Sequence, residues 1–193
     1  DAWLMLAYAC AKSDMREQER NAYLKYLERV SEERPRMTAE LNLAEAEMGL
    51  GRLPDAIRGY RGVIDLTSHM ERSRSVIETE TLALWGLAVA LDRRGDASAA
   101  EMSVERALGA DPSAYLITAD PNVFFVPAYE RLWYIGLALA GQQKRATSAG
   151  EKLALARETV VVWQGYVRQA SSTDRWTRVA SRHVARAEKE LRV

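Results

Sequence analysis

Residues 81–112 read TLALWGLAVALDRRGDASAAEMSVERALGADP, and this stretch predicts two helices joined by a tight turn. The first helix is expected from about residue 75 to Asp92, and the second over residues 97–108. Gly95 marks the turn, because glycine readily adopts the left-handed conformation that commonly ends a helix. Pro112 stops the second helix, because the residue before a proline disfavours α geometry. The stretch therefore predicts one antiparallel helical hairpin.

The apolar positions of that second helix also occur earlier in the chain. The recurring positions are Ala22, Tyr26 and Val30, then Ala56, Tyr60 and Ile64, then Ala100, Val104 and Leu108. The first two sets lie 34 residues apart, and the third follows after 44. Residues 67–80 are mostly polar and contain no Gly or Pro, so extension of the flanking helices accounts for the longer step. A period in this range predicts a helical repeat array.

The predicted fold is all-α, a right-handed α-solenoid of about four hairpins and a capping helix, with about nine helices in a single array over residues 1–193. The hairpins are expected at about residues 1–35, 37–70, 75–110 and 127–169, and the capping helix at 173–192. Arrays of this kind more often bind other molecules than catalyse reactions. The repeat therefore predicts a class of function and leaves the partner open.

Local signals set the expected ends of several helices. Pro35 is expected to close the first hairpin, and Thr38 to cap the next helix, because its hydroxyl can accept an orphan backbone N–H. Gly51 is expected to end that helix, and Pro54 to lie in the first turn of its partner, where its missing N–H is tolerated. The candidates for capping the last helix are Ser172, Thr173 and Asp174.

The long connection at residues 110–126, ADPSAYLITADPNVFFV, interrupts the repeat. It holds two Asp-Pro pairs and both phenylalanines of the chain, so it is expected to be extended. One interpretation is a partner-binding arm. The other, which we favour, is a packing strap that tucks apolar side chains over helix ends, namely Tyr115, Phe124 and Phe125.

Composition sets broad limits on the chain. The 193 residues include 27 basic and 27 acidic side chains, and 48% are hydrophobic, enough for a sizeable core. The only cysteine is Cys10, which excludes an internal disulfide and lies at a packing position. No uninterrupted apolar run is long enough to cross a membrane. The first residue is Asp1 and not Met, so we expect a longer chain or a removed leader upstream.

These patterns resemble the tetratricopeptide repeat family, whose motif is a helical hairpin of 34 residues. Residues 81–112 carry the resemblance best, through Leu84, Leu87, Ala88, Leu91, Gly95, Ala100, Val104, Ala107 and Pro112. Residues 37–66 carry it through Leu43, Ala44, Gly51, Ala56 and Tyr60, and residues 1–35 through Trp3, Leu6, Ala7, Ala22, Tyr26 and Pro35. Residues 129–157 match on their first helix alone, through Leu132, Ile135, Gly136 and Leu139. About two thirds of the chain is covered.

The resemblance implies a role for the small residues at the helix contacts. Ala44, Ala88 and Gly136 are expected to let the second helix of the same hairpin approach closely. Ala56 and Ala100 are expected to do the same for the next hairpin. A larger side chain there would overpack the contact, at a typical cost of about 1–3 kcal/mol.

The resemblance also implies a concave partner-binding groove lined by the first helix of each hairpin. The groove positions are Leu4, Tyr8, Leu41, Glu45, Trp85, Val89, Trp133 and Leu137. Because most are apolar or aromatic, an apolar helix or extended segment is the expected partner. The basic residues with which some family members clamp a terminal carboxylate are missing. The alternative interpretation is that these side chains form the core or lie under the 110–126 connection.

Basic side chains follow one face of the predicted last helix, at Arg175, Arg178, Arg182, Arg186 and Lys189. Residues 142–193 carry 11 basic and 5 acidic groups, net +6. Such a face could contact phosphate, lipid head groups or an acidic partner, although most such stripes are the solvated side of an amphipathic helix. Nucleic acid is the less favoured ligand, because no stacking aromatics interleave with the stripe.

The residues offer little chemistry, so we predict neither an enzyme nor a cofactor or metal site. His69 and His183 lie far apart in the chain, and no His/Cys cluster has zinc spacing. Glu40, Glu45 and Glu47 lie close together without an obvious partner for acid–base work.

We expect a protein-binding adaptor within a larger bacterial envelope, secretion or motility complex, placed in the periplasm, the envelope or the cytoplasm. The alternative is a regulatory or sensory module that docks its basic last helix on nucleic acid or anionic lipid. A third hypothesis is self-assembly, in which the first helix stacks on a neighbouring copy.

Overall fold

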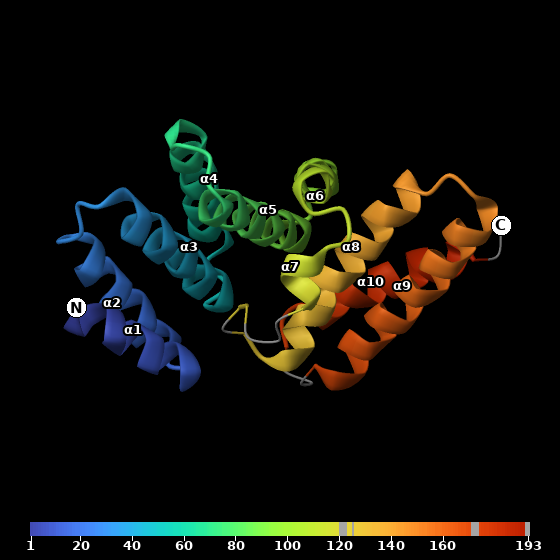
Figure 1. The fold of residues 1–193 in the computed structure, drawn as a ribbon. Coiled ribbons are helices and arrows are strands. Elements are labelled where there is room, and N and C mark those ends of the chain that lie inside the picture. Colours follow the sequence, from blue (N-terminus) through green and yellow to red (C-terminus); the bar gives the residue numbers. More distant parts are fainter. Residues whose placement is uncertain (120–122, 125, 171–173, 192–193) are drawn as a thin grey trace. The chain divides into compact units, whose positions relative to one another are not determined.

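The computed structural model describes residues 1–119, 123–124, 126–170 and 174–191, and the described elements are all helical (Figure 1). The α-helices are α1 (Ala2–Lys12), α2 (Arg16–Leu27), α3 (Glu33–Gly49), α4 (Leu53–His69), α5 (Arg74–Arg94), α6 (Ala97–Ala110), α7 (Tyr115–Thr118), α8 (Arg131–Arg145), α9 (Ala149–Gln169) and α10 (Thr177–Glu190). A 3₁₀ turn, η1 (Ala128–Glu130), precedes α8. The all-α, solenoid-like prediction is therefore confirmed.

The chain divides into two compact units, Asp1–Ser103 and Val104–Val193. In the first unit, coloured blue to green in Figure 1, each helix from α1 to α5 packs on the next along the chain, and α3 also contacts α5. Packing between neighbours in sequence is the hallmark of solenoid arrays, because each hairpin buries its apolar face on the following one.

Most of the recurring sequence positions are buried in the core, whereas Val30 and Ile64 are half-buried. Within the first unit, Ala22, Tyr26, Ala56 and Tyr60 are all buried. A Cβ placed on Gly59 of α4 would lie 2.8 Å from the Cβ of Ala44 in α3, so the two helices of this hairpin almost touch. The predicted close approach at Ala44 is therefore confirmed.

The first turn of α3 corrects two local predictions. The helix begins at Glu33, so Pro35 lies in its first turn instead of closing the preceding hairpin. Proline is tolerated there, because the first backbone N–H groups of a helix have no partner within it. Thr38 lies one turn further on, and its hydroxyl donates to the carbonyl of Arg34 at 3.3 Å instead of capping the helix.

The other helix ends of the first unit follow the predicted signals. Gly51 and Gly95 both have positive φ, at 77° and 90°, just after α3 and α5. Pro54 lies in the first turn of α4. The predicted helix extension through residues 67–80 is also confirmed, since α4 runs to His69 and α5 starts at Arg74.

The second unit is built on α8, α9 and α10. Here α9 packs against both α8 and α10, while η1 contacts α8 and α9. Its core is aromatic: the rings of Trp133 and Trp163 meet edge to face at 5.3 Å, and His183 stacks on Trp163 at 4.2 Å. The predicted cap at Asp174 is wrong, because the N-cap position of α10 is Trp176 and no side chain caps this helix. The carboxylate of Asp174 instead accepts from the backbone N–H of Trp176 at 3.2 Å, in the turn before the helix. The other two candidates, Ser172 and Thr173, lie outside the described residues.

The connection before α8 is not extended throughout, contrary to the prediction. The carboxylate of Asp111 accepts from the backbone N–H groups of Tyr115 at 3.0 Å and Leu116 at 2.9 Å, which starts the short helix α7. Phe124 is buried and stacks on Tyr134 of α8 at 4.3 Å, as the strap interpretation predicts. The strap interpretation is wrong for Tyr115, because 65% of its surface is exposed. Phe125 lies outside the described residues.

Candidate functional site

The predicted groove positions of the first unit range from half-buried to fully buried. On α1, Leu4 and Tyr8 are half-buried. On α3, Leu41 and Glu45 are almost completely buried, and on α5 the counterparts Trp85 and Val89 are fully buried. A fully buried side chain has no surface to offer a partner. In this conformation Trp85 and Val89 belong to the core, which is the alternative interpretation of these positions.

In the second unit the groove positions lie on α8, and they too are buried. Trp133 is fully buried within the aromatic cluster with Trp163, and Leu137 is nearly so.

The burial of the groove positions on α5 has a signal in the sequence, namely the unbroken apolar run at residues 82–91. A helix that is apolar all round is buried on every side.

Tyr8 is held in place by an aromatic contact. Its ring meets the ring of Tyr23 in α2 at 6.4 Å with an interplanar angle of 84°. Tyr23 is fully buried, and burial raises the pKa of its phenol, an effect that the side chain of Asn42 in α3 opposes. The half-buried pair of Leu4 and Tyr8 is therefore packed, through Tyr8, on the fully buried ring of Tyr23.

A buried ion pair lies near Tyr23, between Arg16 and Glu19 of α2. Arg16 Nη1 donates to Glu19 Oε2 at 2.8 Å, and Arg16 Nε donates to Asp14 Oδ1 at 3.0 Å. Glu19 is fully buried, and this burial raises the pKa of its carboxyl group against the opposing effect of Arg16. The negative charge of Glu45 also stabilises the Arg16 guanidinium. The α2–α3 contact thus contains carboxylates that sequence reasoning did not pair.

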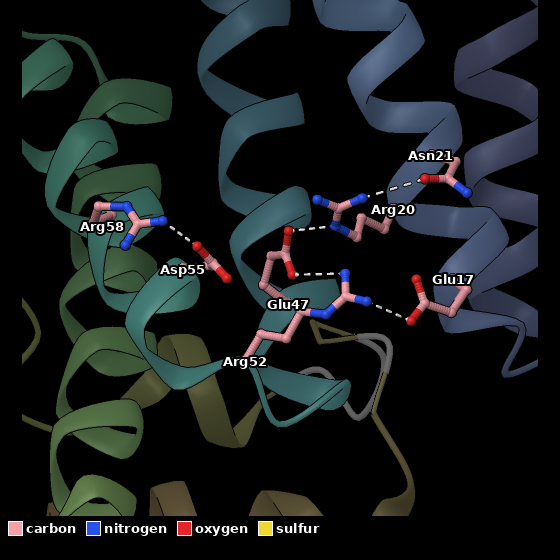
Figure 2. A network of polar contacts seen from close by, with 7 residues as sticks. All are labelled: Glu17, Arg20, Asn21, Glu47, Arg52, Asp55 and Arg58. Carbon is pink, nitrogen blue, oxygen red and sulfur yellow. Dashed lines mark hydrogen bonds and ion pairs between the residues drawn. The ribbon is translucent and has the colours of Figure 1, made fainter.

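A second network joins α2, α3 and the start of α4 (Figure 2). Glu47, almost completely buried, accepts from Arg20 Nε at 2.5 Å and lies 3.6 Å from Arg52 Nη1. Arg52 Nη2 also donates to Glu17 Oε1 at 2.7 Å. The sequence showed no obvious partner of Glu47 for acid–base work, and the partners found here are arginines, which make Glu47 a structural group. Glu40 is likewise paired, with Arg36 at 2.8 Å.

The basic residues of the last helix share one exposed face of α10. The five side chains, all exposed, are Arg175, just before the helix, and Arg178, Arg182, Arg186 and Lys189 on it. Ala180 and Ala187 are buried in the same helix, which packs on α9. Arg186 pairs with Glu190 at 3.2 Å, so part of the positive charge is offset.

The residues that form the outer face of α1 were not identified from the sequence, although the self-assembly hypothesis places this helix against a neighbouring copy. We use this name for Ala2, Met5, Leu6 and Ala9, which are all exposed. Met5 is 68% exposed and Leu6 is 44% exposed, although the family resemblance places Leu6 at a packing position. The expectation for Leu6 is wrong, because the core contacts of this helix are made from the opposite side, by Ala7 and Cys10. The burial expected for Cys10 is confirmed.

The described part of the chain contains no group of three or more His, Cys, Asp or Glu side chains that could hold a metal ion. Of the two histidines, His69 is exposed and lies 3.8 Å from Asp65, while His183 is packed against Trp163. None of the described helices combines the length and the apolar character needed to cross a membrane.

Comparison with known proteins gives no match to any family model, curated protein or solved structure.

Proposed function

We propose that this chain is a protein-binding scaffold built from tetratricopeptide-like hairpins, which holds an apolar helix or extended segment of a partner. The observation that carries the proposal is the pair of half-buried side chains Leu4 and Tyr8. The ring of Tyr8 packs against the buried ring of Tyr23. The sequential helix packing of the first unit supports the same class of function, since such arrays present extended binding surfaces.

The geometry favours Leu4 and Tyr8 as the anchor of the partner. They are four residues apart on α1, so their side chains are neighbours on one helix face. Tyrosine is enriched among residues that dominate binding energy, and a ring fixed by packing loses little entropy on binding. The expected partner therefore offers apolar side chains.

The test is binding of peptides selected from a random displayed library against the immobilised chain. Titration calorimetry of the best peptide is expected to show at least about a tenfold rise in Kd for Leu4→Ala combined with Tyr8→Ala, since truncating a hot-spot side chain costs about 2 kcal/mol. The matched control is Leu6→Ala, because Leu6 is exposed and lies on the opposite side of α1 from Leu4 and Tyr8. Unchanged affinity of the first variant with intact helicity, or the absence of any selected peptide, would overturn the proposal.

The proposal extends to membership of a larger bacterial assembly. Its support is compositional, from the abundance of Ala and Arg in the sequence. A stable complex that elutes with the chain from its source cells, and that is lost with Leu4→Ala and Tyr8→Ala, is the expected result.

A second candidate function is docking of α10 on an anionic surface. The observation that favours it is the exposure of all five basic side chains on one face of this helix. Binding to vesicles with anionic lipid and to duplex DNA is to be measured at low and moderate salt, since phosphate contacts give a steep salt dependence. Charge reversal at Arg178 and Arg182 should abolish binding. Reversal of Arg157 and Arg168, exposed on α9, is the control with equal net charge.

A further inference from the structure

We propose that the basic face of α10 lies flat on an anionic lipid membrane, held by charge and without inserting side chains into the bilayer. The basic face is the name used here for Arg178, Arg182, Arg186 and Lys189. The inference rests on the second candidate function above and deepens it, because it names lipid as the anionic surface. It depends on the line that these charges form, on the residues beside them and on the packing behind the helix.

The basic face is a straight line of charge along α10. Its members follow one another at steps of four, four and three residues, so they fall within an arc of roughly 80° on the helix. The line is roughly 16 Å long, at 1.5 Å per residue. Arg175, just before the helix, is exposed as well. A ligand that contacts one of these side chains can therefore contact all of them from the same direction.

Most of this charge is not neutralised within the part of the chain that the structure describes. No described carboxylate pairs with Arg178, Arg182 or Lys189. Arg186 does have a partner, since its Nε lies 3.2 Å from Glu190 Oε1. Three positive charges in line are therefore available to an anionic surface.

The exposed side of α10 has almost no apolar surface. Between the basic side chains lie only Ser181 and Ala185, and the Ser181 hydroxyl donates to the carbonyl of Thr177 at 2.9 Å. The opposite side of the helix, with Ala180 and Ala187, is buried, and the helix packs on α9. Helices of an array pack on one another through apolar side chains. The exposure of the basic face therefore follows from its own residues, which offer a ligand charge and little else.

Two carboxylates beside the basic face favour a flat ligand over a groove. Glu190 lies roughly 40° beyond Arg186 around the helix, and Glu188 lies roughly 80° beyond Arg178 on the other flank. Glu188 is fixed on its flank, because it accepts from Gln164 Nε2 of α9 at 3.1 Å. A helix in the major groove of duplex DNA has phosphates on both sides, which would repel both carboxylates. A flat membrane meets the basic face alone.

The size of the expected effect favours lipid over an acidic helix of another protein. Exposed ion pairs contribute little each, and this face adds no apolar contact that would strengthen them. An anionic membrane acts through the summed potential of many headgroups, so each basic side chain near it strengthens binding about fivefold. Four such side chains give an enhancement on the order of several hundredfold over neutral lipid.

Cosedimentation of the full chain with vesicles measures the binding. Vesicles of two parts phosphatidylcholine and one part phosphatidylglycerol should bind the chain at low salt, and vesicles of phosphatidylcholine alone should not. The affinity should fall steeply as salt is raised, because the charges are exposed and therefore screened. Phosphatidylserine in place of phosphatidylglycerol should change the affinity by less than about twofold, since the contact responds to charge and not to headgroup shape. Binding that is equally strong to neutral vesicles overturns the proposal.

Arg178→Gln combined with Arg182→Gln tests the assigned face. We expect the affinity for the anionic vesicles to fall about 25-fold, about fivefold for each side chain. The matched control is Arg58→Gln combined with Arg61→Gln, exposed on α4, which removes the same net charge. Circular dichroism establishes that both variants keep their helix content. Equal losses for the two variants would mean that net charge and not the basic face drives binding, and would overturn the proposal.

Fluorescent labels on two helices test the flat arrangement. Cys10 is the only cysteine and is buried, so a label can be directed to Ala185→Cys, beside the basic face, or to Ala154→Cys, exposed on α9. A quencher on the lipid headgroups should quench the first label more strongly, because α9 lies roughly 10 Å behind α10. A quencher deep in the acyl chains should affect neither. Equal quenching of both labels from the headgroups, or quenching from the acyl chains, contradicts the arrangement.

Duplex DNA is the competing ligand, tested at the same total phosphate concentration as the vesicles. We expect it to bind more weakly than the anionic vesicles, because of the carboxylates that flank the basic face. Tighter binding to DNA would overturn the choice of lipid and leave docking on an anionic surface in place. Binding to neither ligand would overturn both.

Discussion

Gly136 of α8 and Trp163 of α9 are in such close contact that a Cβ on Gly136 would lie 2.5 Å from Cε2 of the indole. Trp163 is itself held between the ring of Trp133 and the stacked imidazole of His183. The indole therefore cannot move aside without disturbing two further rings. The small residue that the sequence predicts at this helix contact is thus required by an aromatic core.

Gly136→Ala is expected to destabilise the second unit by about 1–3 kcal/mol, because the added methyl group overpacks the contact with Trp163. Urea denaturation followed by tryptophan fluorescence measures the loss. Gly109→Ala in α6 is the control, since nothing lies within 4 Å of the added Cβ. The control should be neutral or stabilising by up to about 1 kcal/mol, because alanine favours helix. Equal effects of the two substitutions would contradict the overpacking account.

Gly95→Ala is expected to cost about 1 kcal/mol for a different reason. Its φ of 90° is a conformation that side chains with a Cβ rarely adopt, although nothing lies within 4 Å of the added atom. The strain is therefore in the backbone alone. Gly95→Asn should cost less, because asparagine tolerates the left-handed region better than alanine. Thermal unfolding of the pair checks this order, and a greater loss with Asn would refute it.

The ends of the helices could be predicted where a local signal decides them. Gly51 and Gly95 end helices through their own backbone conformation, and Asp111-Pro112 through a restriction on the preceding residue. Pro35 misleads because proline is compatible with both the end of one hairpin and the first turn of the next helix. The neighbouring sequence does not distinguish these two positions.

The candidate site was harder to predict, because burial and pairing depend on neighbouring helices. The family spacing places Trp85 on a groove, whereas the apolar run around it indicates burial, and the second signal is the one that agrees with the structure. The pair of Arg36 and Glu40 could be predicted from its spacing of four on one helix. The pair of Arg20 and Glu47 spans 27 residues and depends on the packing of α2 against α3.

Glu47→Ala is expected to destabilise the first unit by about 1–3 kcal/mol, because it leaves the guanidinium groups of Arg20 and Arg52 without their shared partner. The control is Asp55→Ala, which removes the exposed pair between Asp55 and Arg58 seen in Figure 2. An exposed pair of this kind contributes about 0.2–1 kcal/mol, so the control should have a small effect. Chemical denaturation compares the two variants, and a larger loss for Asp55→Ala would contradict the structural role of Glu47.

The stability of the first unit should fall as pH rises above the ordinary range of a glutamic acid. Burial raises the pKa of Glu19 above its usual 4.5, against the opposing charge of Arg16 and with the support of the nearby Asp14. Between the unfolded and folded pKa values, the native state binds more protons than the unfolded state. The contribution of Glu19 is therefore fully present below about pH 4.5 and is lost as pH rises through the folded pKa.

Glu19→Gln isolates this effect, because it keeps the shape of the side chain and removes its titration. The variant should lose part of the decline in unfolding free energy with rising pH, measured by urea denaturation at intervals from acidic to neutral pH. Asp65→Asn is the control, since the Asp65 side chain is exposed and lies away from Glu19 on α4. Its pH profile should follow that of the wild type. A Glu19→Gln profile that is as steep as the wild-type profile would show that other groups set the pH dependence.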